Sequence, residues 1–160
     1  MNKEMRRNDR QVTDPAQIVE IMKECEILHL GLKDGDGIYV VPLHFGIAGS
    51  PEAPVLYTHS FGEGHKMDLV AENDYGFVQM DCDVRLQAAE AACGFSSSFK
   101  SVMAECRVTI VSDNEEKKKG LAALMEHYSG SCNWDIPDAA LDKLGILKIE
   151  VIEMTCKVHD

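Results

Sequence analysis

The sequence predicts a mainly β fold, an antiparallel barrel of six strands with flanking helices. Apolar runs, some of which alternate with polar residues, recur along the 160 residues and are separated by short turns rich in Gly, Asp and Pro. Consecutive strands of this kind pair antiparallel, and closing the sheet removes its exposed edges. No linker or internal repeat interrupts the pattern, so a single domain over residues 1–160 is expected.

The first helix is predicted to begin at Asp14 and to end near Cys25. Asp14 precedes Pro15, and Gln17 follows three residues after the carboxylate, which is a capping-box arrangement. Apolar residues then recur at helical spacing, so one stripe of the helix faces the core. These residues are Ile18, Ile21, Met22 and Cys25.

Three strands are expected next. Residues 27–32 and 38–46 flank a turn of Asp and Gly over 33–37, which indicates a β-hairpin. The loop 49–54 leads into a third strand over 55–60. A short helix around 67–71 follows and is predicted to end at Asn73, because Asn tolerates the left-handed conformation at a helix end.

The second half of the chain predicts three further strands and two helices. Strands are expected over 76–84 and 101–111, with the small-residue stretch 88–98 between them as a loop. An amphipathic helix from Asn114 stops at Gly130, and a short helix is expected over 137–144. Alternation over 147–151 predicts the closing strand.

Composition narrows the function classes. A net charge of −11 disfavours nucleic acid as a partner, because such binding depends on Lys and Arg. No apolar run approaches the roughly 20 residues of a membrane-spanning helix, and the charged N-terminus lacks a secretory signal, so a cytoplasmic protein is expected. The six cysteines form no CxxC pair and the histidines lack metal-binding spacing, so reduced thiols and no metal are expected.

The segment 57–66 carries the most informative polar residues. A strand ends there in Ser60 and in glycines before a helix whose first turn holds Lys66. Free N–H groups at a helix start, a hydroxyl and an ammonium together can hold a phosphate. The alternative is an ordinary strand–loop–helix connection, and the segment contains neither a P-loop nor a dinucleotide-binding glycine motif.

Short runs in a fixed order carry a resemblance that covers nearly the whole chain. The runs are residues 6–10, 30–32, 40–46, 56–60, 64–66, 101–102 and 149–157. Together they resemble the pyridoxamine 5'-phosphate oxidase-like family of FMN-binding split β-barrels and, within it, the nitroimidazole-resistance branch.

This resemblance implies a homodimer with FMN at the subunit interface. It places the phosphate on Ser60 and Lys66, in the loop that also contains Gly64 and His65. It implies that the isoalloxazine ring is approached by Val41, Pro42, Leu43 and His44 and, from a later strand, by Ser101 and Val102. The relatives carry a histidine at the position of His59 beside the flavin, where an imidazole can act as the catalytic proton donor.

The expected function is therefore an FMN-dependent oxidoreductase that passes electrons from reduced FMN to a small acceptor such as a nitroaromatic. Two alternatives stay open: a non-catalytic flavin-binding or sensing module, and a haem-binding relative of the same barrel. Cys106 stands where the family has glycine, which can place a thiol near the cofactor. Trp134 is a candidate for packing over the flavin or at the dimer interface.

Overall fold

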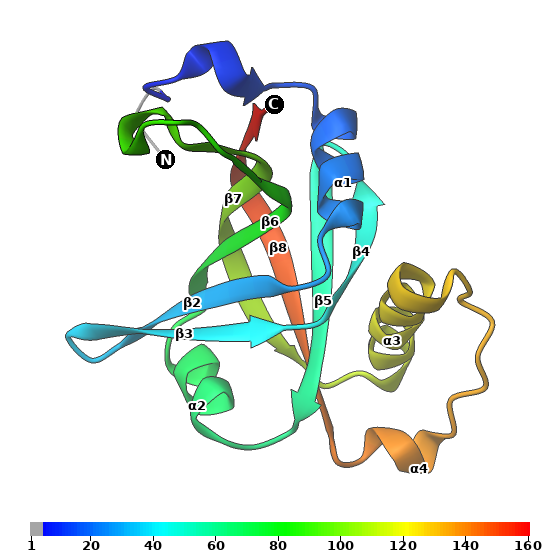
Figure 1. Cartoon of the computed structure of the whole chain (residues 1–160). Coiled ribbons are helices and arrows are strands. Elements are labelled where there is room, and N and C mark those ends of the chain that lie inside the picture. Colours follow the sequence, from blue (N-terminus) through cyan, green and yellow to red (C-terminus); the bar gives the residue numbers. More distant parts are fainter. Residues whose placement is uncertain (1–4) are drawn as a thin grey trace.

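The computed structural model describes residues 5–160 and shows a mainly β chain built on one antiparallel sheet (Figure 1). The strand order is β3-β2-β6-β7-β8-β5-β4, with β1 paired to β8. The strands are β1 (Gln11–Val12), β2 (Leu28–Asp34), β3 (Gly37–Leu43), β4 (Phe45–Ser50), β5 (Ala53–Phe61), β6 (Tyr75–Gln87), β7 (Ser96–Val111) and β8 (Leu144–His159).

Among residues 5–160, four α-helices flank the sheet: α1 (Pro15–Glu24), α2 (His65–Glu72), α3 (Asn114–Ser129) and α4 (Asp138–Leu141). Single 3₁₀ turns lie at Asn8–Arg10 and Ala92–Gly94. Within the described part of the chain, no helix is both long and apolar enough to cross a membrane.

Most helix boundaries follow local signals, although α4 covers only Asp138–Leu141 of the helix expected over 137–144, and Asn73 is a further exception. The Asp14 carboxylate accepts a hydrogen bond from the Ala16 N–H, and α1 ends at Cys25. Gly130 ends α3 in the left-handed conformation, with φ of 70°. The φ of −150° at Asn73 is extended rather than left-handed, because the chain passes there almost directly into β6.

The strand count differs from the prediction, since eight strands are described rather than six. The expected strand over 38–46 divides at His44, because Leu43 pairs with Leu28 while Phe45 pairs with Thr58 on a different strand. The other addition is the short β1, which pairs with β8. The expected loop over 88–98 is shorter, since β7 begins at Ser96, and β8 runs well beyond 147–151.

The division at His44 determines how the barrel closes. β3 and β4 stand at the two ends of the strand order, yet a single residue, His44, separates them in the sequence. The described strands pair no further across this point, so the barrel is joined there by the covalent chain instead of a ladder of hydrogen bonds. We refer to this division between β3 and β4 as the split.

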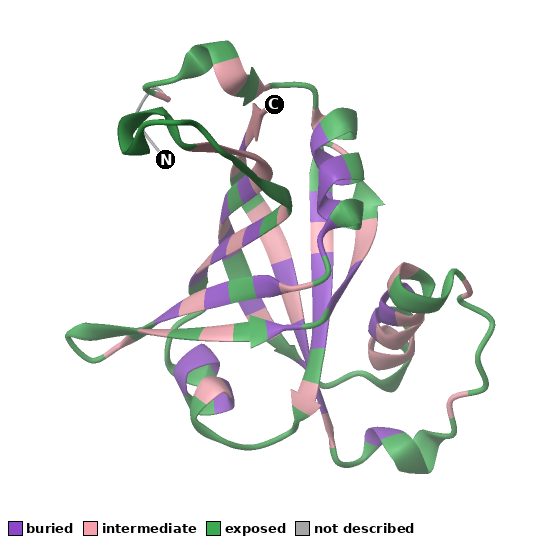
Figure 2. Ribbon diagram, viewed as in Figure 1, coloured by how far each residue is buried: buried purple, intermediate pink, exposed green. Residues whose placement is uncertain are grey.

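Burial alternates along the strands, with inward side chains in the core and outward ones exposed (Figure 2). The main core cluster contains residues of α1, α2 and most strands, among them Met22, Leu30, Leu56 and Val102. A second cluster, made of Tyr57, Val111, Ala123 and Ile146, lies under α3. α3 approaches β4 so closely that a Cβ at Gly46 would lie 2.2 Å from the Ala123 carbonyl carbon.

Candidate functional site

The split leaves two strand edges without a partner. Among the described residues β3 pairs only with β2, and the last residues of β5, His59 to Phe61, pair only with β8. Main-chain N–H and C=O groups on such edges remain free to hydrogen-bond a ligand. The region therefore offers polar main-chain groups beside exposed side chains of β3.

The start of α2 lies directly after this edge. Gly64 precedes the helix with φ of 113°, a conformation that side chains rarely adopt, and no side chain caps the helix. The N–H groups of Met67 and Asp68 bond to the Gly64 carbonyl, whereas those of His65 and Lys66 have no described partner. Free N–H groups at a helix start, together with the helix dipole, favour an anion.

His59, His44 and Lys66 form the electrostatic centre of this region. Partial burial lowers the pKa of the His59 imidazole, and the positive charges of His44 and Lys66 lower it further. Burial also lowers the pKa of the Lys66 ammonium. These effects disfavour the protonated forms of His59 and Lys66.

His44 is held in place from α3. Its ring packs edge-on against Tyr128, with ring centroids 5.0 Å apart. The Tyr128 hydroxyl accepts a hydrogen bond from the Phe45 N–H at 3.2 Å and donates to the Glu26 carbonyl. The bend between β3 and β4 is thus fixed by a helix far along the chain.

The side chains of Ser60 and His65 already have partners in the structure. The Ser60 hydroxyl donates to the Phe61 carbonyl at 2.9 Å and also lies 3.9 Å from the Met67 sulfur. His65 Nε2 lies 2.8 Å from Asp34 Oδ2 on β2, and its ring packs edge-on against Tyr39.

Several predicted ring contacts point away from the split. Leu43 and Val102 are buried in the core, and Val41 packs against the same cluster. Pro42 is exposed on the outer face of β3. A ligand on that face would therefore meet the main chain of Val41 and Leu43 rather than their side chains.

A sequence model of the pyridoxamine 5'-phosphate oxidase family matches residues 14–158. The chain belongs to this family. A protein from Bacteroides thetaiotaomicron, named for 5-nitroimidazole antibiotic resistance, has a solved structure that is similar to the chain at 28% identity, with a TM-score of 0.79 over 92% of this chain and 86% of that one. This likeness supports the nitroimidazole-resistance branch.

Two more distant structures share the fold. The flavocytochrome Anf3 of Azotobacter vinelandii has 19% identity and a TM-score of 0.81 over 98% of this chain and 72% of its own. The FAD- and haem-binding protein of Mycobacterium smegmatis has 14% identity and a TM-score of 0.82 over 94% of this chain and 74% of its own. No curated protein sequence matches the chain significantly.

Ser101 and Val102, singled out by the family resemblance, lie on β7, which is not a neighbour of β3 or β5 in the sheet. His59 and Val111 both pair with Ile146, and Ser101 lies ten residues before Val111 on β7. This is a path of about 30 Å along the strand. On the other side of the sheet, the neighbouring Met103 pairs with Gln79, Gln79 with His29 and His29 with Pro42, so β2 and β6 stand between these residues and β3.

Sequence reasoning missed Thr58, which is 1% exposed and whose hydroxyl has no described hydrogen-bond partner. It precedes His59 on β5, next to the split. A buried hydroxyl without a partner is unfavourable and can be satisfied by a water or a ligand. The sequence offers no signal for it, because a threonine is common on any strand.

The remaining candidates lie outside this region. Cys106 is buried in the core opposite Gly76, so it does not bring a thiol to the split. Trp134 is 51% exposed on the loop after α3, where its indole N–H donates to the Ser131 carbonyl. Within residues 5–160, no group of three His, Cys, Asp or Glu side chains is arranged to hold a metal ion.

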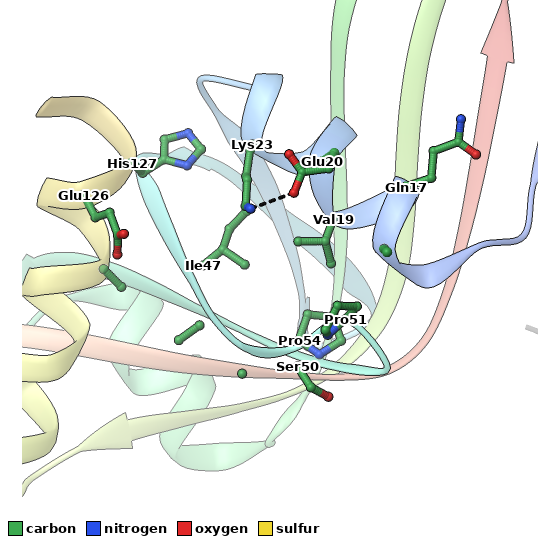
Figure 3. Close-up of a pocket in the computed structure, with 14 residues that line it drawn as sticks. Gln17, Val19, Glu20, Lys23, Ile47, Ser50, Pro51, Pro54, Glu126 and His127 are labelled. Atoms are coloured by element: carbon green, nitrogen blue, oxygen red, sulfur yellow. Dashed lines mark hydrogen bonds and ion pairs between the residues drawn. The ribbon is translucent and has the colours of Figure 1, made fainter. Parts of the chain in front are cut away.

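A hollow of about 660 Å³ lies between α1, α3 and the β4–β5 hairpin, and none of the predicted site residues lines it (Figure 3). Glu20 and Lys23 pair across its wall at 2.7 Å, with Gln17, Glu126 and His127 nearby. It is separate from the split.

Proposed function

We propose that this chain binds FMN at the split of its barrel and acts as an oxidoreductase on small acceptors such as nitroaromatics. The observation that carries the proposal is the meeting of three features at one place: free strand edges, the uncapped start of α2, and Lys66 close to His59. Together they suit a ligand that is planar and polar at one end and phosphorylated at the other.

The phosphate fits the start of α2. Lys66 supplies a positive charge, the free N–H groups of His65 and Lys66 supply donors, and Gly64 allows close approach. The Ser60 hydroxyl can turn from the Phe61 carbonyl to the ligand. Binding a dianion also offsets the positive charges that lower the pKa of His59.

The ring fits the edges of β3 and β5. Main-chain groups of residues 41–44 and the exposed face of Pro42 would meet the isoalloxazine, and the unpaired Thr58 hydroxyl lies close to this region. Ser101 and Val102 lie on β7, with β2 and β6 between them and β3, and Val102 is buried, so in this proposal the ring contacts from this strand come from a second copy of the chain. The proposed functional unit is accordingly a homodimer.

When bound, the flavin would supply the electron-transfer chemistry. The chain orients it, excludes water with the second copy, and places His59 beside it. A nitro group that gains electrons also needs protons, and an imidazolium is a suitable donor. Since the pKa of His59 is lowered, its imidazolium is a stronger acid than an ordinary one but is populated only at lower pH.

The first test is the visible spectrum of the purified protein, together with mass analysis of any cofactor released on denaturation. Released FMN supports the proposal. Released FAD would identify FAD as the cofactor instead, and a Soret band would identify haem. A colourless protein that fails to bind added FMN contradicts flavin binding altogether. If FMN binds but neither nitroimidazole nor another nitroaromatic is reduced with chemically reduced flavin in place, the non-catalytic alternative holds.

A further inference from the structure

The β2–β3 hairpin is attached to the start of α2 by one polar contact. Asp34, the last residue of β2, places Oδ2 at 2.8 Å from Nε2 of His65, the first residue of α2. Tyr39 of β3 packs edge-on against the same imidazole, with centroids 5.2 Å apart. Both partners come from the hairpin, which is distant in sequence from the helix.

We propose that Asp34 is a positioning residue for the phosphate site: through His65 it holds the first turn of α2 where the FMN phosphate binds. This inference rests on the proposed function. Asp34 itself does not touch the phosphate in this account. Its carboxylate fixes the orientation of the imidazole, as a carboxylate behind a metal-ligating histidine does.

The helix start is held by the core on one side, where Met67 of its first turn is buried, and by the hairpin on the other. Gly64 has no side chain, its φ is 113°, and no side chain caps the first turn. A glycine in this conformation is flexible unless its neighbours are fixed. On the exposed side of the turn, the described side-chain contacts are those of His65 with Asp34 and Tyr39, whereas Met67 holds the buried side.

The orientation also has a consequence for the free ring nitrogen. With Nε2 directed at the carboxylate, Nδ1 points away from Asp34 and has no described partner. In this proposal the carboxylate, by fixing Nε2, also fixes where Nδ1 lies beside the start of α2.

Electrostatics alone and the positioning role predict opposite effects of an Asp34 substitution on phosphate binding. Asp34 is a negative charge close to an anion site, so its removal alone would strengthen phosphate binding. Positioning predicts that Asp34→Asn weakens it. The sign of the change therefore separates the two accounts.

The experiment compares FMN with riboflavin, which lacks the phosphate, by fluorescence titration of the flavin-free protein. In Asp34→Asn we expect FMN binding to weaken about fivefold, as suits a half-exposed pair, while riboflavin binding stays unchanged. Asp36→Asn is the matched control: it removes the same charge from the same turn, and Asp36 makes no described side-chain contact. It should leave the ratio of the two affinities as in the wild type.

A double-mutant cycle shows whether Asp34 acts through His65. If it does, Asp34→Asn has no further effect in a His65→Gln background. An unchanged or stronger FMN affinity in Asp34→Asn, or an equal loss for FMN and riboflavin, would overturn the positioning role. Failure of the wild-type protein to bind either flavin would instead refute the proposed function, and a circular-dichroism melt of each variant confirms that it is folded.

Discussion

Lys66→Gln is the most direct perturbation of the proposed phosphate site, because it removes the ammonium while keeping most of the side-chain stem. A hydrogen bond to a charged group contributes about 1.5–3 kcal/mol net, which corresponds to about tenfold to hundredfold in affinity. Lys66 is partly buried beside the free N–H groups of α2, so solvent screens its charge less than that of a surface lysine. We expect FMN to bind about tenfold to hundredfold more weakly to the variant, and riboflavin to bind as before.

The same substitution should have no cost to the flavin-free fold. Burial lowers the pKa of Lys66 in the folded chain relative to the unfolded chain. The unfolded state therefore binds this proton more tightly, and the charged lysine disfavours folding at neutral pH. Removing the charge should leave the melting temperature of the flavin-free protein unchanged or higher, while FMN affinity falls.

The assay is isothermal titration with FMN and with riboflavin, paired with thermal melts without flavin. Lys33→Gln is the control, since Lys33 is an exposed lysine of β2 without a described contact. Equal FMN affinity in the Lys66 and Lys33 variants would refute the phosphate assignment. An equal loss of riboflavin binding in Lys66→Gln would show that the lysine acts on the ring or the fold instead.

Three further outcomes are expected. His59→Asn should slow nitroaromatic reduction about a hundredfold, as for loss of a general acid, with little change in FMN affinity; equal turnover would assign His59 to packing alone. Because the pKa of His59 is lowered, the wild-type reduction rate should rise as the pH falls below the usual pKa range of histidine. The rate of His59→Asn should not change with pH in that range, and parallel pH profiles of the two proteins would exclude the imidazole as proton donor. Gly46→Ala should destabilise the fold by about 3 kcal/mol in a denaturant titration, because the new Cβ would lie 2.2 Å from the backbone of α3. Gly37→Ala is the control and should change stability far less, because its Cβ would lie 3.4 Å from the Asp34 carbonyl oxygen.

Helix ends could be predicted because their signals are local. Asp14 before Pro15, and Gly130 after an amphipathic run, each determine a boundary through bonds within a few residues. Asn73 shows the limit of such rules. Its backbone is extended because β6 begins two residues later, and the pairing of that strand is not local.

The division of β3 from β4 could not be predicted from the sequence. Residues 38–46 form one nearly continuous apolar run, and the change of partner at His44 depends on where Leu28 and Thr58 lie in space. The run also lacks strict alternation, so the inward direction of Leu43 was not evident.

The candidate site was partly predictable for the same reason. Ser60, Gly64 and Lys66 lie within one short segment, so their proximity follows from the sequence. The link between His65 and Asp34, and the distance of Ser101 from His59, arise from strand register and needed the three-dimensional structure.

A barrel that is joined at one point by the covalent chain has unpaired main-chain N–H and C=O groups at that point, and a ligand that bonds to them becomes part of the fold. If FMN occupies this place, its binding free energy adds to the free energy of unfolding, by about 2.7 kcal/mol when the free flavin is at a hundred times its dissociation constant. Flavin-free chains would expose the edges of β3 and β5 and so be the more readily aggregated or degraded form. The amount of this protein in a cell would then follow the supply of its cofactor.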